Sequence, residues 1–193
     1  MLKKIVAVFL FVLIFSACEG GYNTTKPPIE TKIKILELDD DEGWLKTVVV
    51  ENKPGHISPN KWTRSNFTQN FNAIDPDSIS SACIQWHNSY SDTWLVTASS
   101  YLISPGSSIE FYTLYDGYYL NVTQMNFLVS SEGTTWTQLW TTGNTVSSFS
   151  HRWSKNSIDL SAYEGQNLFF AWQYIGDDGY YMALDGVYLT ILL

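Results

Sequence analysis

The chain has 193 residues, of which 45% are hydrophobic and 16% aromatic, and it carries a formal net charge of −8. This length is enough for one domain with a core of its own. The acidic balance argues against nucleic acid as a partner, because proteins bind phosphates through an excess of Lys and Arg.

The first 17 residues predict a lipoprotein signal peptide. Two lysines precede an unbroken apolar run over 5–15, which is too short to span a bilayer, and small residues precede Cys18. The pattern resembles the bacterial lipobox, which implies cleavage before Cys18 and lipid on its sulfur and new amino group. We therefore expect an exported protein anchored by lipid to the cell envelope, at the outer membrane or the cell surface. The alternative is an ordinary secretory signal cleaved near Ala17.

Residues 18–32 are predicted to be a lipidated cysteine followed by a flexible tether, because this stretch is polar and rich in Gly, Thr and Pro. Residues 33–193 then form the single domain. Cleavage removes two of the 11 basic residues and none of the 19 acidic ones, so the mature chain has a formal charge of 9 − 19 = −10. With Cys18 used by the anchor, Cys83 has no partner for a disulfide and is expected to be a buried strand thiol.

The domain predicts strands throughout, since aromatic and β-branched residues alternate with polar ones between closely spaced turn signals. The expected strands are 44–51, 61–67, 81–87, 93–102, 108–115, 120–130, 135–141, 152–160, 167–175 and 180–192. Asp116-Gly117 predicts a two-residue hairpin, and Asp177-Asp178-Gly179 a further hairpin turn. These features together favour an all-β fold, a two-sheet antiparallel jelly-roll sandwich.

The last expected strand contains an unusual carboxylate. From Val187 onward the odd-numbered residues are apolar, and strict alternation places Asp185 on the same face, toward the core. A buried carboxylate requires a cation or several hydrogen-bond donors. The alternatives are a bound metal ion, or backbone N–H groups with Trp or Tyr donors. A third alternative is a β-bulge at Gly186, which would shift the register and turn Asp185 away from the core.

The order of several short motifs resembles a known family. These motifs are Asp-Glu-Gly-Trp at 41–44, Trp-Leu-Val-Thr at 94–97, the serine-rich turn within 126–136, Asp-Leu-Ser-Ala-Tyr-Glu-Gly-Gln at 159–166 and Ala-Leu-Asp-Gly-Val at 183–187. Together they resemble the cleaved-adhesin or choice-of-anchor J domain of bacterial surface proteins, a jelly roll akin to MAM and galactose-binding-like domains. The family usually has a second Asp where this chain has Gly186.

The resemblance implies a structural calcium site. Carried over to this chain, it assigns Asp41, Glu42 and Asp185 as the metal ligands. Calcium prefers six to eight oxygen ligands, which an acidic run beside a glycine can supply. The alternative is a solvated acidic run before the first strand.

The function expected is a non-catalytic binding or adhesion module that recognises a glycan or an envelope or host protein. Exposed rings near loops suit such contacts, and the candidate ligand-binding residues are Trp140, Trp153, Tyr118 and Tyr119. Trp94 and Trp172 are expected in the core instead. An alternative is a structural or assembly lipoprotein of the envelope without a soluble ligand.

A glycoside hydrolase is the less favoured third hypothesis. The acids inside expected strands are Glu110, Asp159 and Asp185, and nothing in the sequence pairs them as a hydrolase requires. No nucleophile elbow and no His or Cys spacing typical of a metal site occurs. We therefore expect no enzymatic activity.

Overall fold

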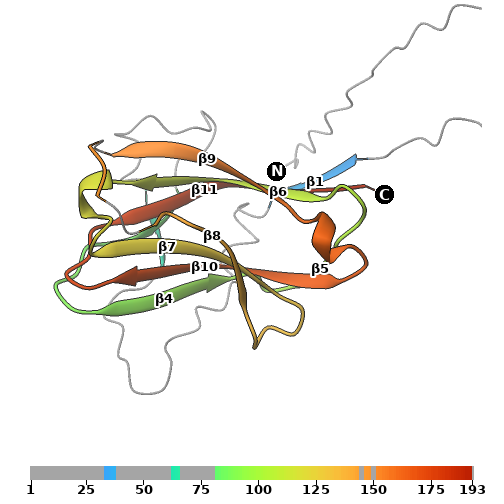
Figure 1. The fold of residues 1–193 in the computed structure, drawn as a ribbon, viewed down its shortest axis with the longest axis horizontal. Helices are drawn as coiled ribbons and strands as arrows, with labels where there is room; N and C mark the ends of the chain where they lie inside the picture. The colour runs from blue at the N-terminus through green and yellow to red at the C-terminus, as the bar shows by residue number, and fades with distance from the viewer. Residues whose placement is uncertain (1–32, 38–61, 66–80, 144–145, 149–150, 193) are drawn as a thin grey trace, which may run out of the picture. The chain divides into compact units, whose positions relative to one another are not determined.

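The computed structural model describes residues 33–37, 62–65, 81–143, 146–148 and 151–192, which form two stacked antiparallel β-sheets (Figure 1). The predicted all-β, two-sheet sandwich is therefore confirmed. Within these ranges the helical segments are two short 3₁₀ turns, and no helix is long and apolar enough to cross a membrane.

The first sheet has six strands in the order β2-β3-β11-β6-β9, with β1 paired to the far part of β11. Its strands are β1 (Ile33–Glu37), β2 (Thr63–Ser65), β3 (Ser81–Ile84), β6 (Ser108–Tyr115), β9 (Arg152–Asp159) and β11 (Met182–Leu192). The second sheet has the order β4-β10-β7-β8, with β5 paired to the start of β10. Its strands are β4 (Ser91–Val96), β5 (Tyr101–Leu102), β7 (Thr123–Ser130), β8 (Thr137–Thr141) and β10 (Asn167–Gly176).

Several strand predictions need correction. The expected strand 93–102 is two strands, β4 and β5, and β1 was not among the expected strands at all. The expected strand 44–51 lies outside the described residues. By contrast, 108–115 coincides with β6.

Both hairpin predictions are wrong, because each turn joins strands of different sheets. Asp116 instead begins the 3₁₀ turn η3 (Gly117–Tyr119), and its Oδ1 accepts a hydrogen bond of 2.9 Å from the Tyr118 N–H. Asp178 adopts a positive φ of 54° in the connection from β10 to β11. Short polar side chains cap turns and tolerate this conformation, so the same residues suit a crossover between sheets as well as a hairpin.

The core between the sheets is built from large aromatic side chains. Phe111 of β6 lies 5.1 Å from Phe127 of β7 between ring centroids, and its ring meets those of Trp140 and Trp172 edge-on at 5.4 and 5.7 Å. Such pairs stabilise a fold by about 0.5–1.5 kcal/mol each beyond the area that they bury. The Trp172 prediction is therefore confirmed, since its side chain is fully buried.

A β-bulge at Gly186 interrupts the alternation of β11. Met182 and Leu184 belong to the main core before the bulge, whereas Val187 and Leu189 belong to it afterwards. The pairing of β11 with β6 shifts register at the same place, and Gly186 has a positive φ of 55°. The extra residue therefore exchanges the two faces of the strand.

The bulge also decides the orientation of Asp185. Before Gly186, Asp185 shares a face with Ala183, which packs in a smaller cluster with Cys83 and Leu114 on the other side of the sheet. The expectation that Asp185 faces the main core with Val187 is therefore wrong. Asp185 is nonetheless buried, and its Oδ1 accepts a hydrogen bond of 3.0 Å from the Gly186 N–H.

A row of hydrogen-bonded polar side chains crosses the outer face of the second sheet. Asp92 Oδ1 accepts from Gln173 Nε2 at 2.8 Å, and Gln173 Oε1 accepts from Asn126 Nδ2 at 3.0 Å. Asn126 Oδ1 accepts in turn from Gln124 Nε2 at 2.8 Å, which also donates to Thr141 Oγ1. Because a carboxylate only accepts, Asp92 fixes the orientation of every amide in this polar row.

Trp94 belongs to this outer face and not to the core, contrary to the sequence prediction. Its Nε1 donates to Asp92 Oδ1 at 2.8 Å, and its ring lies 5.6 Å from that of Trp136. Alternation along β4 explains the difference, because Leu95 next to it faces the core.

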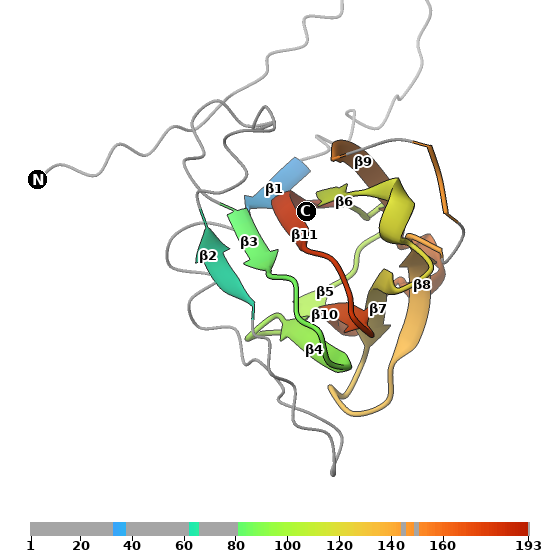
Figure 2. The same ribbon diagram turned by 90° about the vertical axis from the view of Figure 1, so that its left-hand side faces the viewer.

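Four loops meet at one end of the sandwich, which we call the tip. They are 85–90, 116–122, 142–151 and 177–181, and each connects a strand of one sheet to a strand of the other. Figure 1 shows the tip on the left, and Figure 2 looks directly onto it. The ends of β1 and β11 lie at the opposite end.

Candidate functional site

Large hydrophobic side chains are exposed mainly at the tip. Of the six such side chains exposed among the described residues, five lie on its loops: Trp86, Tyr90, Tyr118, Tyr119 and Val146. The sixth, Leu102, lies in β5 toward the other end. A soluble domain has little reason to gather exposed rings in one place unless they contact a partner, so the tip is the candidate functional site.

Sheet order places the loop 177–181 in the middle of the tip. In the first sheet β11 lies between β3 and β6, and in the second sheet β10 lies between β4 and β7. The connection from β10 to β11 is therefore flanked by the loop 85–90 on one side and the loop 116–122 on the other. A backbone hydrogen bond of 3.4 Å from the His87 N–H to the Gly179 carbonyl joins the first pair.

Stacked rings join the middle loop to the loop 116–122. The rings of Tyr119 and Tyr180 lie 4.2 Å apart and 8° from parallel, and Tyr180 also contacts Tyr181 at 4.5 Å. The Asp177 N–H donates to the Val122 carbonyl at 3.0 Å. Because rings and backbone both connect these loops, the aromatic side chains have defined positions.

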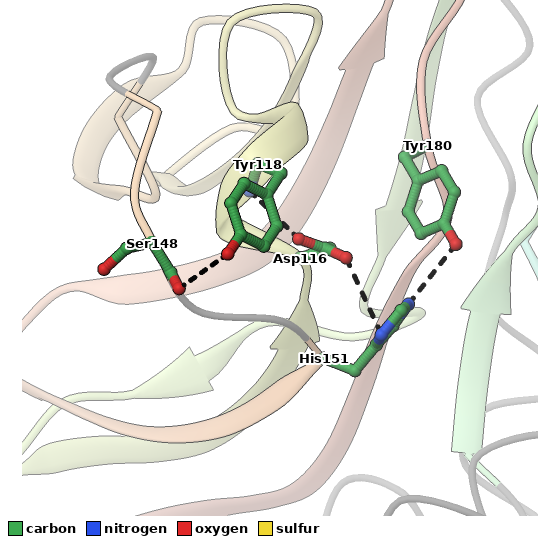
Figure 3. A network of polar contacts seen from close by, with 5 residues as sticks. All are labelled: Asp116, Tyr118, Ser148, His151 and Tyr180. Carbon is green, nitrogen blue, oxygen red and sulfur yellow. Dashed lines mark hydrogen bonds and ion pairs between the residues drawn. The ribbon is translucent and has the colours of Figure 1, made fainter.

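A polar network holds Ser148 and His151, two described residues of the loop 142–151, against the same place (Figure 3). Asp116 Oδ2 lies 3.6 Å from His151 Nδ1, and His151 Nε2 lies 3.3 Å from the Tyr180 hydroxyl. The Tyr118 hydroxyl donates to the Ser148 carbonyl at 3.0 Å. Partial burial raises the pKa of Tyr180, and the nearby Tyr119 and Asp116 raise it further. Tyr180 therefore stays neutral and can donate or accept.

Tyr174 of β10 supports the loop 177–181 from the core side. Its hydroxyl donates to the Tyr180 carbonyl at 2.8 Å, and the Tyr180 N–H donates to Thr123 Oγ1 at 2.6 Å. A Cβ on Gly176 or Gly179 would come within 2.5 or 2.6 Å of that hydroxyl. The two glycines are thus required for the loop to pass over Tyr174.

The tip is acidic as well as aromatic. Asp177 and Asp178 are exposed in its middle loop, and Asp116 is buried beside His151. The sequences of all four loops contain no Lys and no Arg. Among the described residues of these four loops, the acidic side chains therefore have no Lys or Arg beside them in sequence except Arg152, which is exposed at the start of β9 directly after His151.

The structure separates the four predicted ligand-binding residues. Tyr118 and Tyr119 are exposed at the tip, with 52% and 41% of their surfaces accessible. Trp153 is half-buried and packs against the cluster that contains Tyr181, whereas Trp140 packs against the core. Contact of these four with a ligand stays a prediction. Sequence reasoning missed Trp86, because it was counted within an expected strand.

The predicted calcium ligands are described only in part. Asp41 and Glu42 lie outside the described residues, while Asp185 is buried on the outer side of β11. Within the described ranges, no group of three or more His, Cys, Asp or Glu side chains comes together as a metal site. The described residues by themselves do not make a calcium site, so the calcium prediction depends on Asp41 and Glu42.

The acids considered for hydrolysis have other roles. Glu110 accepts an ion pair of 2.9 Å from Lys155 Nζ. Asp159 accepts hydrogen bonds from the Ser161 hydroxyl and from the Ser161 N–H, the latter at 2.9 Å. The hydroxyl first and the N–H second lower the pKa of Asp159. A general acid needs a raised pKa, so the environment of Asp159 does not suit that role.

Comparison with known proteins identifies the fold. No protein-family model matches the chain, and no curated protein matches it. Among solved structures, the K1 cleaved adhesin domain of Lys-gingipain from Porphyromonas gingivalis W83 aligns with a TM-score of 0.50 and 14% identity, over 83% of this chain and 98% of that one. The K3 domain of the same protein aligns with a TM-score of 0.46 and 17% identity, over 82% of this chain and 91% of that domain. A xylan-binding domain aligns with a TM-score of 0.41 and 10% identity, over 79% of this chain and 96% of that domain.

At this level of identity the likeness concerns the fold. The chain has an adhesin-like β-sandwich fold, and the predicted resemblance to cleaved adhesin domains is confirmed to that extent.

Proposed function

We propose that this chain is a non-catalytic binding module, exported and lipid-anchored through Cys18, that attaches to a glycan or protein partner through its tip. The observation that carries the proposal is the concentration of exposed hydrophobic side chains on the four tip loops. Aromatic residues dominate the energetics of protein interfaces and stack well on sugars.

Three further observations support a binding role. Stacking holds the ring of Tyr119 and a hydrogen bond holds that of Tyr118 before any partner arrives, which lowers the entropy lost on binding. The chain shares its fold with an adhesin domain. Glu110 forms an ion pair with Lys155, which argues against its use as one of the two facing carboxylates of a hydrolase.

The proposal is tested by comparing the full chain with a variant that carries Trp86→Ala and Tyr118→Ala. Both proteins are applied to arrays of glycans and of bacterial and host surface proteins. We expect signals that fall at least tenfold in the double variant, because two exposed rings are lost. The control is Leu102→Ala, which removes an equally exposed side chain at the other end and should bind like the wild type. Equal binding by wild type and double variant would contradict the proposal.

A further inference from the structure

The charges of the tip indicate which partner it accepts. Asp177 and Asp178 are both exposed in the central loop, and this loop and its two neighbours, 85–90 and 116–122, contain no Lys and no Arg. The basic residue at this end is Arg152, which is exposed at the start of β9. Two adjacent carboxylates repel each other unless water or a cation screens them. The central loop is thus complementary in charge to a basic group.

The rings flank these carboxylates on both sides. The loop 85–90, with exposed Trp86 and Tyr90, runs beside the central loop through the His87–Gly179 contact. The ring of Tyr119 stacks on Tyr180, which follows Gly179 in the chain. Burial raises the pKa of Tyr90, and the charges of Asp92 and Asp177 raise it further, so Asp177 lies near this exposed ring. A cation bound at Asp177 is therefore also near the ring of Tyr90, and an aromatic face attracts a cation.

From this arrangement we infer that the tip binds a protein segment rich in Lys or Arg. The inference rests on the proposed function and assigns its partner class. The long aliphatic stem of Lys or Arg packs on the rings of Trp86 and Tyr90 while its charged end pairs with Asp177 or Asp178. A neutral glycan would use the rings but would leave both carboxylates without a complementary group, so the observations favour the basic protein segment.

The test removes charge without changing shape. Asp177→Asn and Asp178→Asn are combined in the full chain, purified in detergent. Asn is among the few residues that accept the positive φ of 54° at position 178, so the loop conformation is retained. The probes are fluorescent hexa-arginine and hexa-lysine peptides, with hexa-glutamine as the neutral peptide, and binding is followed by fluorescence anisotropy.

A matched control removes the same charge from the other end of the sandwich. Asp159→Asn and Glu164→Gln neutralise two exposed carboxylates beside the 3₁₀ turn η4 (Ser161–Tyr163). We expect the basic peptides to bind about fivefold more weakly to the tip variant, since two exposed ion pairs contribute about 0.5 kcal/mol each, and to the control variant as to wild type. Hexa-glutamine should bind weakly to the wild type, the tip variant and the control variant, with the same affinity for all three.

Two outcomes would overturn the inference. One is equal loss of binding in the tip and control variants, which would show attraction by net charge alone. The other is binding of basic peptides that does not change in the tip variant. The proposed function is judged separately by Trp86→Ala with Tyr118→Ala on the arrays. Loss of array binding there, with no effect of the Asp→Asn pair, would leave the tip a binding site for a different partner.

Discussion

Gly186 of β11 and Tyr112 of β6 lie so close that a Cβ added to Gly186 would come within 2.9 Å of Tyr112 Cδ2. The backbone at Gly186 also has a positive φ of 55°. Both features disfavour any other residue, so we expect Gly186→Ala to lower the free energy of unfolding by about 2–3 kcal/mol. Urea denaturation measures this change.

Gly165→Ala is the matched control for that variant. Gly165 has a positive φ of 78°, but a Cβ there would meet no atom within 4 Å. Only the cost of the left-handed backbone conformation remains, so we expect the free energy of unfolding to fall by about 1 kcal/mol. Equal losses in the two variants would show that the contact with Tyr112 does not matter.

Asp92 should be the most sensitive member of the polar row. Asp92→Ala removes the acceptor for both Gln173 Nε2 and Trp94 Nε1. Buried donors that lose their partner cost about 1–3 kcal/mol, so we expect the melting temperature to fall by about 6 °C. Asp177→Ala, an exposed Asp, should change it little. A small effect of Asp92→Ala would mean that water replaces the carboxylate.

Cys83 makes stability depend on pH in the alkaline range. Burial raises the pKa of its thiol from 9.0 to about 12 in the folded protein. The unfolded chain then loses its proton first, so the contribution is fully present below pH 9 and is lost as pH rises toward 12. The slope is at most about 1.4 kcal/mol per pH unit.

Urea denaturation of wild type and Cys83→Ala at several pH values checks this prediction. The variant starts from a lower stability because it leaves a cavity, so the slopes are compared and not the absolute values. We expect a shallower decline above pH 9 in Cys83→Ala. Parallel slopes would assign the alkaline loss to other groups, such as the buried Tyr174 and Tyr181, whose pKa values burial also raises.

Calcium binding is tested by thermal melting. If Asp41, Glu42 and Asp185 hold calcium, an ion at 100 times its dissociation constant stabilises the fold by about 2.7 kcal/mol. Calcium should then raise the melting temperature of the wild type and not that of Asp185→Asn. No shift with excess calcium or with EDTA, in either protein, would refute the site.

Lipid attachment is tested with Cys18→Ser. Without a thiol no thioether can form, so the variant should remain uncleaved or leave the membrane fraction. Metabolic labelling with a radioactive fatty acid and membrane fractionation measure both results. Unchanged labelling and partition would exclude Cys18 as the anchor.

The fold could be predicted because alternation records which face of a strand is buried. Leu168, Phe170, Trp172 and Tyr174 share a face in the sequence and are all buried in β10. The same rule failed at Asp185, since one bulge residue shifts every later side chain to the opposite face. Gly186 was the available signal, because a glycine inside a strand pattern often marks a bulge.

The tip could be predicted only in part. Tyr118 and Tyr119 stood out beside a turn signal, but sheet order alone brings the loop of Trp86 beside the loop of Asp177, which is 91 positions away in the sequence. Such contacts between distant residues depend on which strands of the two sheets the crossover loops connect. The Asp116-Gly117 and Asp177–Gly179 turns looked like hairpins, and that interpretation would have kept each loop within one sheet.

The pairing of Ile33 with Leu192 has a consequence for how the molecule is presented. β11 runs from the tip to its far end, so the chain enters the domain at the end away from the tip (Figure 1). Trp86, Tyr118 and the two aspartates lie at the other end of the sandwich from Ile33, so a group attached at the start of β1 would leave the tip loops uncovered.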